Sequence, residues 1–276
     1  YESSRQVLLG NPAIDQIFFW EFMQKGFWRS LKFMLHLRKE KFDISILNYP
    51  SNRLEYNMVS FLAGASLRLG HYYSRQNLWH FPWLNNRTLK ETKNLHNVEE
   101  NLRLLNFLDI DYKKVTPQPQ IFLSAQDYQF AEEFWQNNHL FSFTRVIAIH
   151  TWSTELKNMH RKCWDKTKFA RLIDYLKQNS KTEVVLIEGP CDRKNNEEII
   201  KLCKTNPIRI QNTTVKQTAA ILQKCSLLIT NDSGVMHLGA TVKTPCVAIF
   251  GPTNPQKLRP FYTRHYVVRR DLPCPR

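Results

Sequence analysis

The chain has 276 residues and a mass of 32.8 kDa, and a hydrophobic content of 42% indicates a folded globular protein whose length suits two domains. No run of about eighteen apolar residues occurs, which argues against a membrane-spanning helix. A formal charge of +15 would attract nucleic acid, an anionic membrane surface or a phosphorylated substrate, and charge does not choose among them. The lysines are spread along the chain, so they indicate a generally basic surface.

The cysteine pattern and the first residues indicate in which cellular compartment the protein is expected. Six cysteines are scattered without a C-x-x-C pair, which favours reduced thiols in the cytoplasm over a disulfide framework or a zinc site. The chain starts at Tyr1 without the basic-then-apolar pattern of a signal peptide, so we expect the native start to lie upstream. The cysteines are Cys163, Cys191, Cys203, Cys225, Cys246 and Cys274.

The first half of the chain alternates between strand-like and helix-like segments. A Gly10-Asn11-Pro12 turn is followed by a basic amphipathic helix at residues 26–41, which we interpret as a surface helix on a sheet in preference to a membrane-contact helix. A strand at 42–47 and a helix at 51–63 come next, and 96–108 reads as another amphipathic helix. This alternation is typical of an α/β domain.

A linker divides the chain. Residues 109–120 carry few apolar side chains and two prolines, Pro117 and Pro119, so we expect one domain at 1–120 and a second at 121–276. The second domain opens on an apolar, buried-looking strand at 145–150. Thr151 and Ser153 follow it directly, and the carboxyl ends of such strands are where ligands bind in doubly wound sheets.

The second half reads as strands and helices in turn, with short connections, which predicts a parallel sheet covered on both faces. Neither a G-x-G-x-x-G nor a Walker A sequence is present, and this disfavours a dinucleotide enzyme or a P-loop ATPase. The expected helices lie at 166–179, 196–203 and 218–223, and the expected strands at 183–187 and 227–229.

The stretch after residue 229 holds the most specific local pattern. Asp232-Ser233-Gly234 forms a sharp polar turn into a helix, whose first N–H groups would make an anion site that a phosphate fits. His237 lies one helical turn after Gly234 and would face the same site. The alternative interpretation is structural: Asp232 is only an N-cap, Gly234 only a turn residue and His237 a half-buried histidine.

Several motifs follow one another in a fixed order along the chain. They are Gly10-Asn11-Pro12 with Asp15, Phe42-Asp43, Gly64-Ala65 with Arg68 and Gly70, the helix from His96, Thr230 to Leu238, Thr244-Pro245, and Phe250 to Thr253. With these motifs the chain resembles glycosyltransferase family 9, the lipopolysaccharide heptosyltransferases, over nearly its whole length. The resemblance implies the GT-B fold, in which two Rossmann-like α/β domains face each other across a cleft. Residues 1–120 would then bind the acceptor and 121–276 the nucleotide sugar.

The resemblance also implies roles for single residues at the donor site. Lys162 matches a lysine that approaches the donor phosphates, and Asp232 an acid that holds the donor sugar. The other matches are Ser233 and Gly234 for amides on the diphosphate, His237 for a nearby histidine, Thr151 and Ser153 for hydroxyls near the phosphate, and Asp192 for an acid near the ribose. The general base of the family is an Asp in a Gly-rich loop after the first strand, which we expect upstream of Tyr1, so no residue of this chain is assigned to it.

The implied activity is inverting, metal-independent transfer of a heptose or related sugar from a nucleotide sugar, ADP-heptose by resemblance. The implied acceptor is a phosphorylated oligosaccharide of the lipopolysaccharide core linked to lipid A, reached from the cytoplasm by peripheral contact with the inner membrane. No metal, cofactor or nucleic-acid partner is expected. The alternative is a catalytically inactive nucleotide-sugar or polyanion-binding protein of the same fold. Nucleic-acid binding ranks below both because no recognisable module supports it beyond charge.

Overall fold

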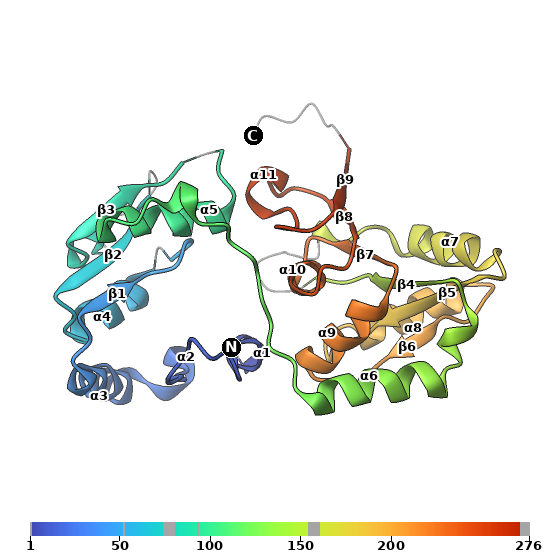
Figure 1. Ribbon diagram of the computed structural model, residues 1–276, viewed down its shortest axis with the longest axis horizontal. Helices are drawn as coiled ribbons and strands as arrows, with labels where there is room; N and C mark the ends of the chain where they lie inside the picture. Colours follow the sequence, from blue (N-terminus) through green and yellow to red (C-terminus); the bar gives the residue numbers. More distant parts are fainter. Residues whose placement is uncertain (1, 52, 74–80, 93, 154–160, 271–276) are drawn as a thin grey trace. The chain divides into compact units, whose positions relative to one another are not determined.

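The computed structural model describes residues 2–51, 53–73, 81–92, 94–153 and 161–270 and shows an α/β chain with two parallel sheets (Figure 1). The chain divides into two compact units. The smaller unit is Ile17–Thr116, and the larger one joins Tyr1–Gln16 to Pro117–Arg276.

The sheet of the larger unit has six parallel strands in the order β6-β5-β4-β7-β8-β9. The chain moves outward from β4 to β6 and then returns to the other side of β4 to continue with β7. The carboxyl ends of β4 and β7 therefore flank the topological switch point, where open α/β sheets bind ligands. The strands are β4 (Arg145–His150), β5 (Thr182–Ile187), β6 (Ile208–Ile210), β7 (Leu227–Asn231), β8 (Cys246–Phe250) and β9 (His265–Arg269).

Two hydrophobic cores cover the two faces of this sheet, because successive side chains of a strand point to opposite faces. Ile147 and Ile149 of β4 pack with α7 and α8, whereas Val146 and Ala148 pack with α6, α9 and α10. The predicted strand at 145–150 and the doubly wound arrangement are thus confirmed, and β6, only three residues long, was not predicted. The helices are α6 (Ala125–Asn137), α7 (Lys166–Lys177), α8 (Arg193–Leu202), α9 (Val215–Lys224), α10 (Gly234–Thr241) and α11 (Pro255–Leu258).

The smaller unit holds a three-stranded parallel sheet in the order β1-β2-β3. The helix expected at 96–108 is present, but it is an α-helix only to Leu102 and continues as a 3₁₀ helix to Leu108. His96 is its N-cap, since Nδ1 accepts the backbone N–H of Val98. The elements are α2 (Phe22–Lys25), α3 (Phe27–Leu37), β1 (Ile44–Ile46), α4 (Leu54–Leu62), β2 (Leu67–Tyr72), β3 (Arg87–Lys90) and α5 (Asn97–Leu102).

The first residues group with the larger unit rather than with the rest of the 1–120 segment. Helix α1 (Glu2–Leu8) lies on α9, where Lys216 Nζ donates to the carbonyl of Leu9 at 2.6 Å. The chain passes between the units near Pro117, inside the predicted linker. A short segment that packs on a helix distant in sequence leaves no mark in local composition, so sequence reasoning placed residues 1–16 with their neighbours.

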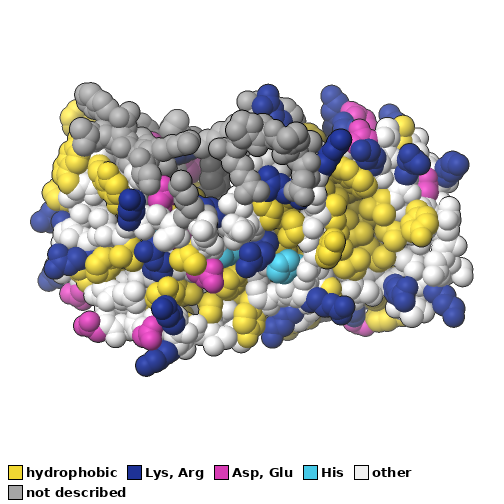
Figure 2. All heavy atoms as spheres, turned by 90° about the horizontal axis from the view of Figure 1, so that it is seen from above, with side chains coloured by type: hydrophobic (Ala, Val, Ile, Leu, Met, Phe, Trp, Pro, Cys, Tyr) yellow, Lys and Arg dark blue, Asp and Glu magenta, His cyan; other side chains and the backbone are white. Residues whose placement is uncertain are grey.

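The described cysteines are all free thiols, and Cys274 lies outside the described residues. Burial raises the pKa of Cys246 to about 12 and that of Cys225 still further, which keeps both protonated. Among the helices that the structure describes, none is long and apolar enough to cross a bilayer. Lys and Arg side chains are dispersed over the face drawn in Figure 2.

We expect Gly239→Ala to destabilise the larger unit. A Cβ at Gly239 would lie 2.5 Å from Leu228 Cδ2, so α10 would have to move away from β7 or the core repack, at a cost of about 1–3 kcal/mol. Urea unfolding followed by circular dichroism measures the loss. Gly234→Ala in the same helix is the matched control, because its Cβ meets nothing within 4 Å. Equal stability of the two variants would contradict the close packing.

Candidate functional site

The loops that follow β4 and β7 bring the predicted donor-site residues together. The two strands pair in parallel with His150 opposite Thr230, so the segment at Thr151 lies beside the turn at Asp232. Ser153 Oγ lies 3.5 Å from the carbonyl oxygen of Asp232. The switch point of the sheet is therefore the place where polar side chains from distant parts of the sequence meet.

Asp232 and Lys162 form an ion pair in this place. Lys162 Nζ lies 2.7 Å from Asp232 Oδ2, with side chains that are 12% and 4% exposed, and Thr253 donates a hydroxyl hydrogen to the same oxygen at 2.7 Å. The N-cap of α10 is Ser233, and in the described part of the chain Asp232 caps no helix. The interpretation of Asp232 as a mere N-cap is therefore wrong, since its carboxylate instead holds the lysine.

The N-terminus of α10 supplies hydrogen-bond donors to the same place. Among the residues that the structure describes, no acceptor faces the backbone N–H groups of Ser233, Gly234 and Val235. A Cβ on Gly234 would meet nothing within 4 Å, so the space before the helix is open to a ligand. His237 lies one turn further on and is exposed rather than half-buried. These donors and the helix dipole suit an anion.

Asn231 ties the loops together and was not singled out in the sequence. Its amide donates to the carbonyl of Thr151 at 2.7 Å and accepts the backbone N–H of Trp164 at 3.0 Å. The residue is completely buried at the end of β7. A polar residue that ends an apolar strand directly before an acid is the signal that could have identified it. Asn231 thereby holds the segment that carries Lys162 against the end of β4.

Gly251 allows the same segment to approach β8 closely. An added Cβ would lie 3.1 Å from the carbonyl oxygen of Arg161 and 3.6 Å from Cα of Lys162. Any side chain at this position would therefore displace the backbone that carries the lysine.

Thr151 Oγ1 and Asp192 Oδ2 bond neighbouring groups of the protein behind the site. Thr151, only 1% exposed, donates to Asn196 at 2.7 Å and accepts from Asn195 at 2.8 Å. Asp192 Oδ2 bonds Nε2 of His150 at 3.1 Å and accepts the backbone N–H of Gly189 at 2.9 Å. Burial raises the pKa of Asp192, but these bonds outweigh it and hold the pKa below its ordinary value.

A polar cavity of about 350 Å³ opens near the carboxyl ends of β5 and β6. Glu188 lines it, and Arg209 holds that carboxylate with Nη2 at 2.5 Å and Nε at 3.1 Å from Oε2. Sequence reasoning did not select Glu188, although it directly follows a strand. In the described ranges no three His, Cys, Asp or Glu side chains are grouped in a way that could hold a metal ion. The cavity is lined by Glu188, Gly189, Pro190, Arg193, Gln211, Asn212 and Thr213.

Comparison with known proteins gives consistent matches. The model of glycosyltransferase family 9 (heptosyltransferase) matches residues 30–276. Lipopolysaccharide heptosyltransferase 3 of Escherichia coli K12 is 27% identical over 95% of this chain and 75% of its own length. Lipopolysaccharide core heptosyltransferase OpsX of Haemophilus influenzae is 24% identical over 89% of this chain and 67% of its own length.

Solved structures show the fold. A glycosyl transferase family 9 protein of Veillonella parvula has a TM-score of 0.81 at 24% identity, covering 98% of this chain and 75% of that one. E. coli ADP-heptose lps heptosyltransferase II has a TM-score of 0.67 at 21% identity, covering 87% and 72%. An E. coli heptosyltransferase with ADP-2-deoxy-2-fluoro heptose has 0.62 at 19%, covering 88% and 70%. The predicted GT-B class, with two Rossmann-like α/β domains, is thus confirmed.

We expect Asn231→Ala to lower the free energy of unfolding by about 2–4 kcal/mol, because it leaves two buried backbone groups without partners. Urea unfolding measures this loss. Asn137→Ala, at an exposed position of α6, is the matched control and should change stability by less than about 0.5 kcal/mol. A loss no larger than that of the control would show that Asn231 does not hold the loops together.

Proposed function

This chain belongs to glycosyltransferase family 9 and is a glycosyltransferase, and from that premise we propose that it transfers a heptose or related sugar from ADP-heptose to a lipopolysaccharide core acceptor. The names of its relatives support the sugar and the acceptor, because they are lipopolysaccharide heptosyltransferases. Titles of two related E. coli structures, which contain ADP and an ADP-heptose analogue, support the nucleotide.

The Lys162–Asp232 ion pair beside the open N-terminus of α10 is the observation that carries the proposal. The donor diphosphate would accept hydrogen bonds from the N–H groups of Gly234 and its neighbours and would meet the ammonium of Lys162. An ammonium has three N–H donors, so Lys162 can keep Asp232 and still bind a phosphate oxygen. Asp232 has a second carboxylate oxygen with which to accept a sugar hydroxyl. His237 would lie near the phosphates from the exposed side of α10.

The nucleoside would occupy the polar cavity at β5 and β6. Its lining includes Glu188, an acceptor of the kind that ribose hydroxyls require. We propose a supporting role behind the donor for Thr151 and Asp192, because Thr151 Oγ1 bonds Asn196 and Asp192 Oδ2 bonds His150. The hydroxyl of Ser153 lies near the backbone of Asp232.

The proposed reaction inverts the anomeric centre without a metal. As the bond between sugar and diphosphate breaks, negative charge develops on the leaving diphosphate, and Lys162 and the N–H groups of α10 stabilise it. A general base takes the proton of the acceptor hydroxyl. No residue of this chain is assigned to that role.

Nucleotide binding tests the donor assignment. In a thermal-shift panel of ADP-, UDP-, GDP- and CMP-linked sugars we expect the ADP-linked donor to raise the Tm, since a ligand at 100-fold over its Kd adds about 2.7 kcal/mol of stability. In a transfer assay of the full-length protein, Lys162→Ala and Asp232→Ala should each lower the rate by at least ~100-fold.

Lys168→Ala, at an exposed position of α7, is the matched control for loss of a lysine. Each site variant leaves one partner of a buried ion pair alone, which destabilises the fold. Circular dichroism therefore has to show that the variants are folded before a loss of transfer is assigned to the site. Normal transfer by both site variants would overturn the site. In the full-length protein, donor binding without transfer to any core acceptor would favour the catalytically inactive alternative.

A lipid-linked acceptor requires the enzyme to reach a membrane. We assign this peripheral contact to α3, in place of the surface-helix interpretation of its sequence, because large apolar side chains of this helix are exposed. Trp28 and Leu35 are 77% and 47% exposed, and they lie seven positions apart with Lys32 between them on the same helical face. Arg29 is exposed one position after Trp28. An aromatic ring flanked by basic side chains is typical of a helix that lies at an anionic membrane surface.

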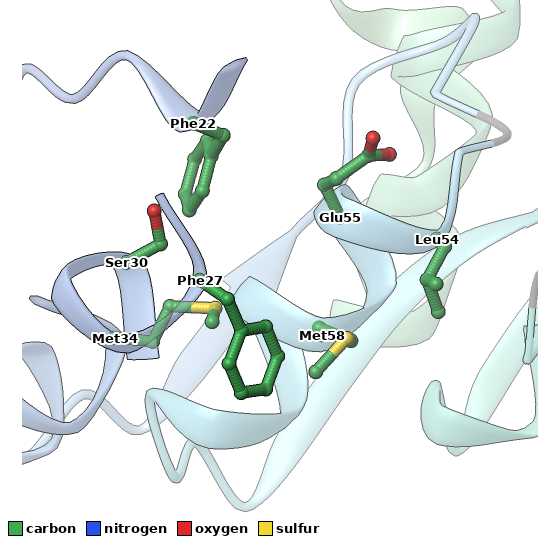
Figure 3. Close-up of a pocket in the computed structure, with 7 residues that line it drawn as sticks. All are labelled: Phe22, Phe27, Ser30, Met34, Leu54, Glu55 and Met58. Atoms are coloured by element: carbon green, nitrogen blue, oxygen red, sulfur yellow. The ribbon is translucent and has the colours of Figure 1, made fainter. Parts of the chain in front are cut away.

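An apolar cavity extends this surface. It has a volume of about 190 Å³ between α2, α3 and α4, and Phe22, Phe27, Met34 and Met58 line it with their side chains, as Figure 3 shows. Phe27 is also 62% exposed, so its ring connects the cavity with solvent. The cavity would accept the terminal carbons of a lipid chain beside the exposed stripe of α3.

We expect Trp28→Ala to weaken binding to vesicles that contain phosphatidylglycerol by roughly 10-fold or more, from the apolar area that an indole buries. Lys32→Glu should also weaken it, and more at low salt than at high salt. Vesicle co-sedimentation measures both effects. Tyr175→Ala, which removes a 70% exposed ring from α7 of the other unit, is the matched control. Vesicle binding that is insensitive to both α3 variants would contradict the assignment.

A further inference from the structure

A buried histidine connects the donor turn with an acid that lies behind it. His150 Nδ1 lies 3.1 Å from Ser233 Oγ, and its Nε2 lies 3.1 Å from Asp192 Oδ2. His150 is 5% exposed and Asp192 is 7% exposed. The three side chains come from the end of β4, the loop after β5 and the N-cap of α10. We call this set the Ser233–His150–Asp192 network.

The hydrogen bonds of this network all point from Ser233 toward Asp192. An ionised carboxylate only accepts, and Asp192 Oδ2 already accepts the N–H of Gly189, so Nε2 of His150 carries the hydrogen. We take His150 as the neutral imidazole, in which Nδ1 is then an acceptor and can take the hydrogen of the Ser233 hydroxyl.

Thr230 does not compete for this role. Its hydroxyl lies 3.4 Å from Nδ1 of His150 and 3.3 Å from Ser233 Oγ, but it donates its hydrogen to the carbonyl of Asn231 at 2.9 Å. The Thr230 oxygen therefore presents only lone pairs to His150 and Ser233, and Ser233 is left as the donor to His150. Ser233 makes no side-chain cap bond to α10, which leaves its hydroxyl available for this contact.

From this geometry we infer that His150 and Asp192 are positioning residues, which turn the hydroxyl hydrogen of Ser233 inward so that its oxygen accepts a hydrogen bond from a sugar hydroxyl of the donor. The inference rests on the proposed function, since it needs a nucleotide sugar at this turn. It separates two tasks at the start of α10. The backbone N–H groups bind the diphosphate, and the Ser233 side chain recognises the sugar, because an outward lone pair repels phosphate oxygens and attracts a hydroxyl hydrogen.

Ser233→Ala removes the outward acceptor and should weaken binding of ADP-heptose by roughly 3- to 10-fold, while the Kd of ADP changes by less than about 2-fold. His150→Gln keeps a side chain that reaches Asp192 and releases the Ser233 hydrogen, so it should have the same selective effect. Asp192→Asn offers an oxygen in the place of Oδ2 and should retain most of the selectivity, whereas Asp192→Ala should lose it. Isothermal titration calorimetry with the two nucleotides measures these ratios.

The double variant Ser233→Ala with His150→Gln distinguishes a positioning role from a structural one. If His150 acts through Ser233, then His150→Gln has no further effect on the ADP-heptose to ADP ratio once the hydroxyl is absent. Additive effects, or equal weakening of ADP and ADP-heptose, would overturn the inference. His265→Gln, on edge strand β9 with its Nδ1 near the carbonyl of Thr263, is the matched control.

A readout without ligand keeps the inference testable if a variant folds poorly. Nitrogen-15 NMR of the imidazoles should show His150 as the Nε2–H tautomer, identified by the signal that His150→Gln removes, and as a mixture of tautomers in Asp192→Ala. An Nδ1–H tautomer, or an imidazolium with hydrogen on both nitrogens, in the unsubstituted protein would overturn the inference. If the unsubstituted protein binds neither nucleotide, the proposed function fails. If it binds both and Ser233→Ala leaves their ratio unchanged, only the inference fails.

Discussion

The parallel pairing of β4 with β7 is the constraint on which the candidate site depends. It places His150 opposite Thr230, so the residues that follow each strand emerge side by side at one edge of the sheet. Asn231 then fastens three segments with one buried amide, because it bonds the loop after β4 and the segment that carries Lys162. The backbone that carries the charged and polar groups of the site is therefore held in place by buried hydrogen bonds.

This arrangement explains why a costly buried ion pair is tolerated at the site. Desolvation of Lys162 and Asp232 opposes folding, and their mutual attraction with the added bond from Thr253 offsets part of that cost. What a transferase gains is charge that is already oriented before the donor arrives, so little reorganisation is needed when charge develops on the leaving group. A site held this way selects its ligand by the direction of its hydrogen bonds as well as by charge.

Both units bury charged side chains, but at different places. The larger unit closes its sheet between two apolar cores and concentrates polar groups at the switch point. The smaller unit buries an ionised side chain in its body, since Glu100 is fully buried and bonds Thr92 and Arg103. Burial raises the pKa of Glu100, and these bonds outweigh it to hold the pKa below its ordinary value. The same unit leaves the ring of Trp28 exposed to solvent.

Local sequence determined the alternation of strands and helices, the turn at Asp232-Ser233-Gly234 and the family, because propensity, turn chemistry and motif order are properties of neighbouring residues. Only the tertiary structure decided which partner each polar atom has. The bonds between Lys162 and Asp232, and between His150 and Asp192, join residues far apart in the chain and depend on strand register. For the same reason Thr151 proved to be turned inward, and residues 1–16 proved to pack on a helix that sequence proximity does not reveal.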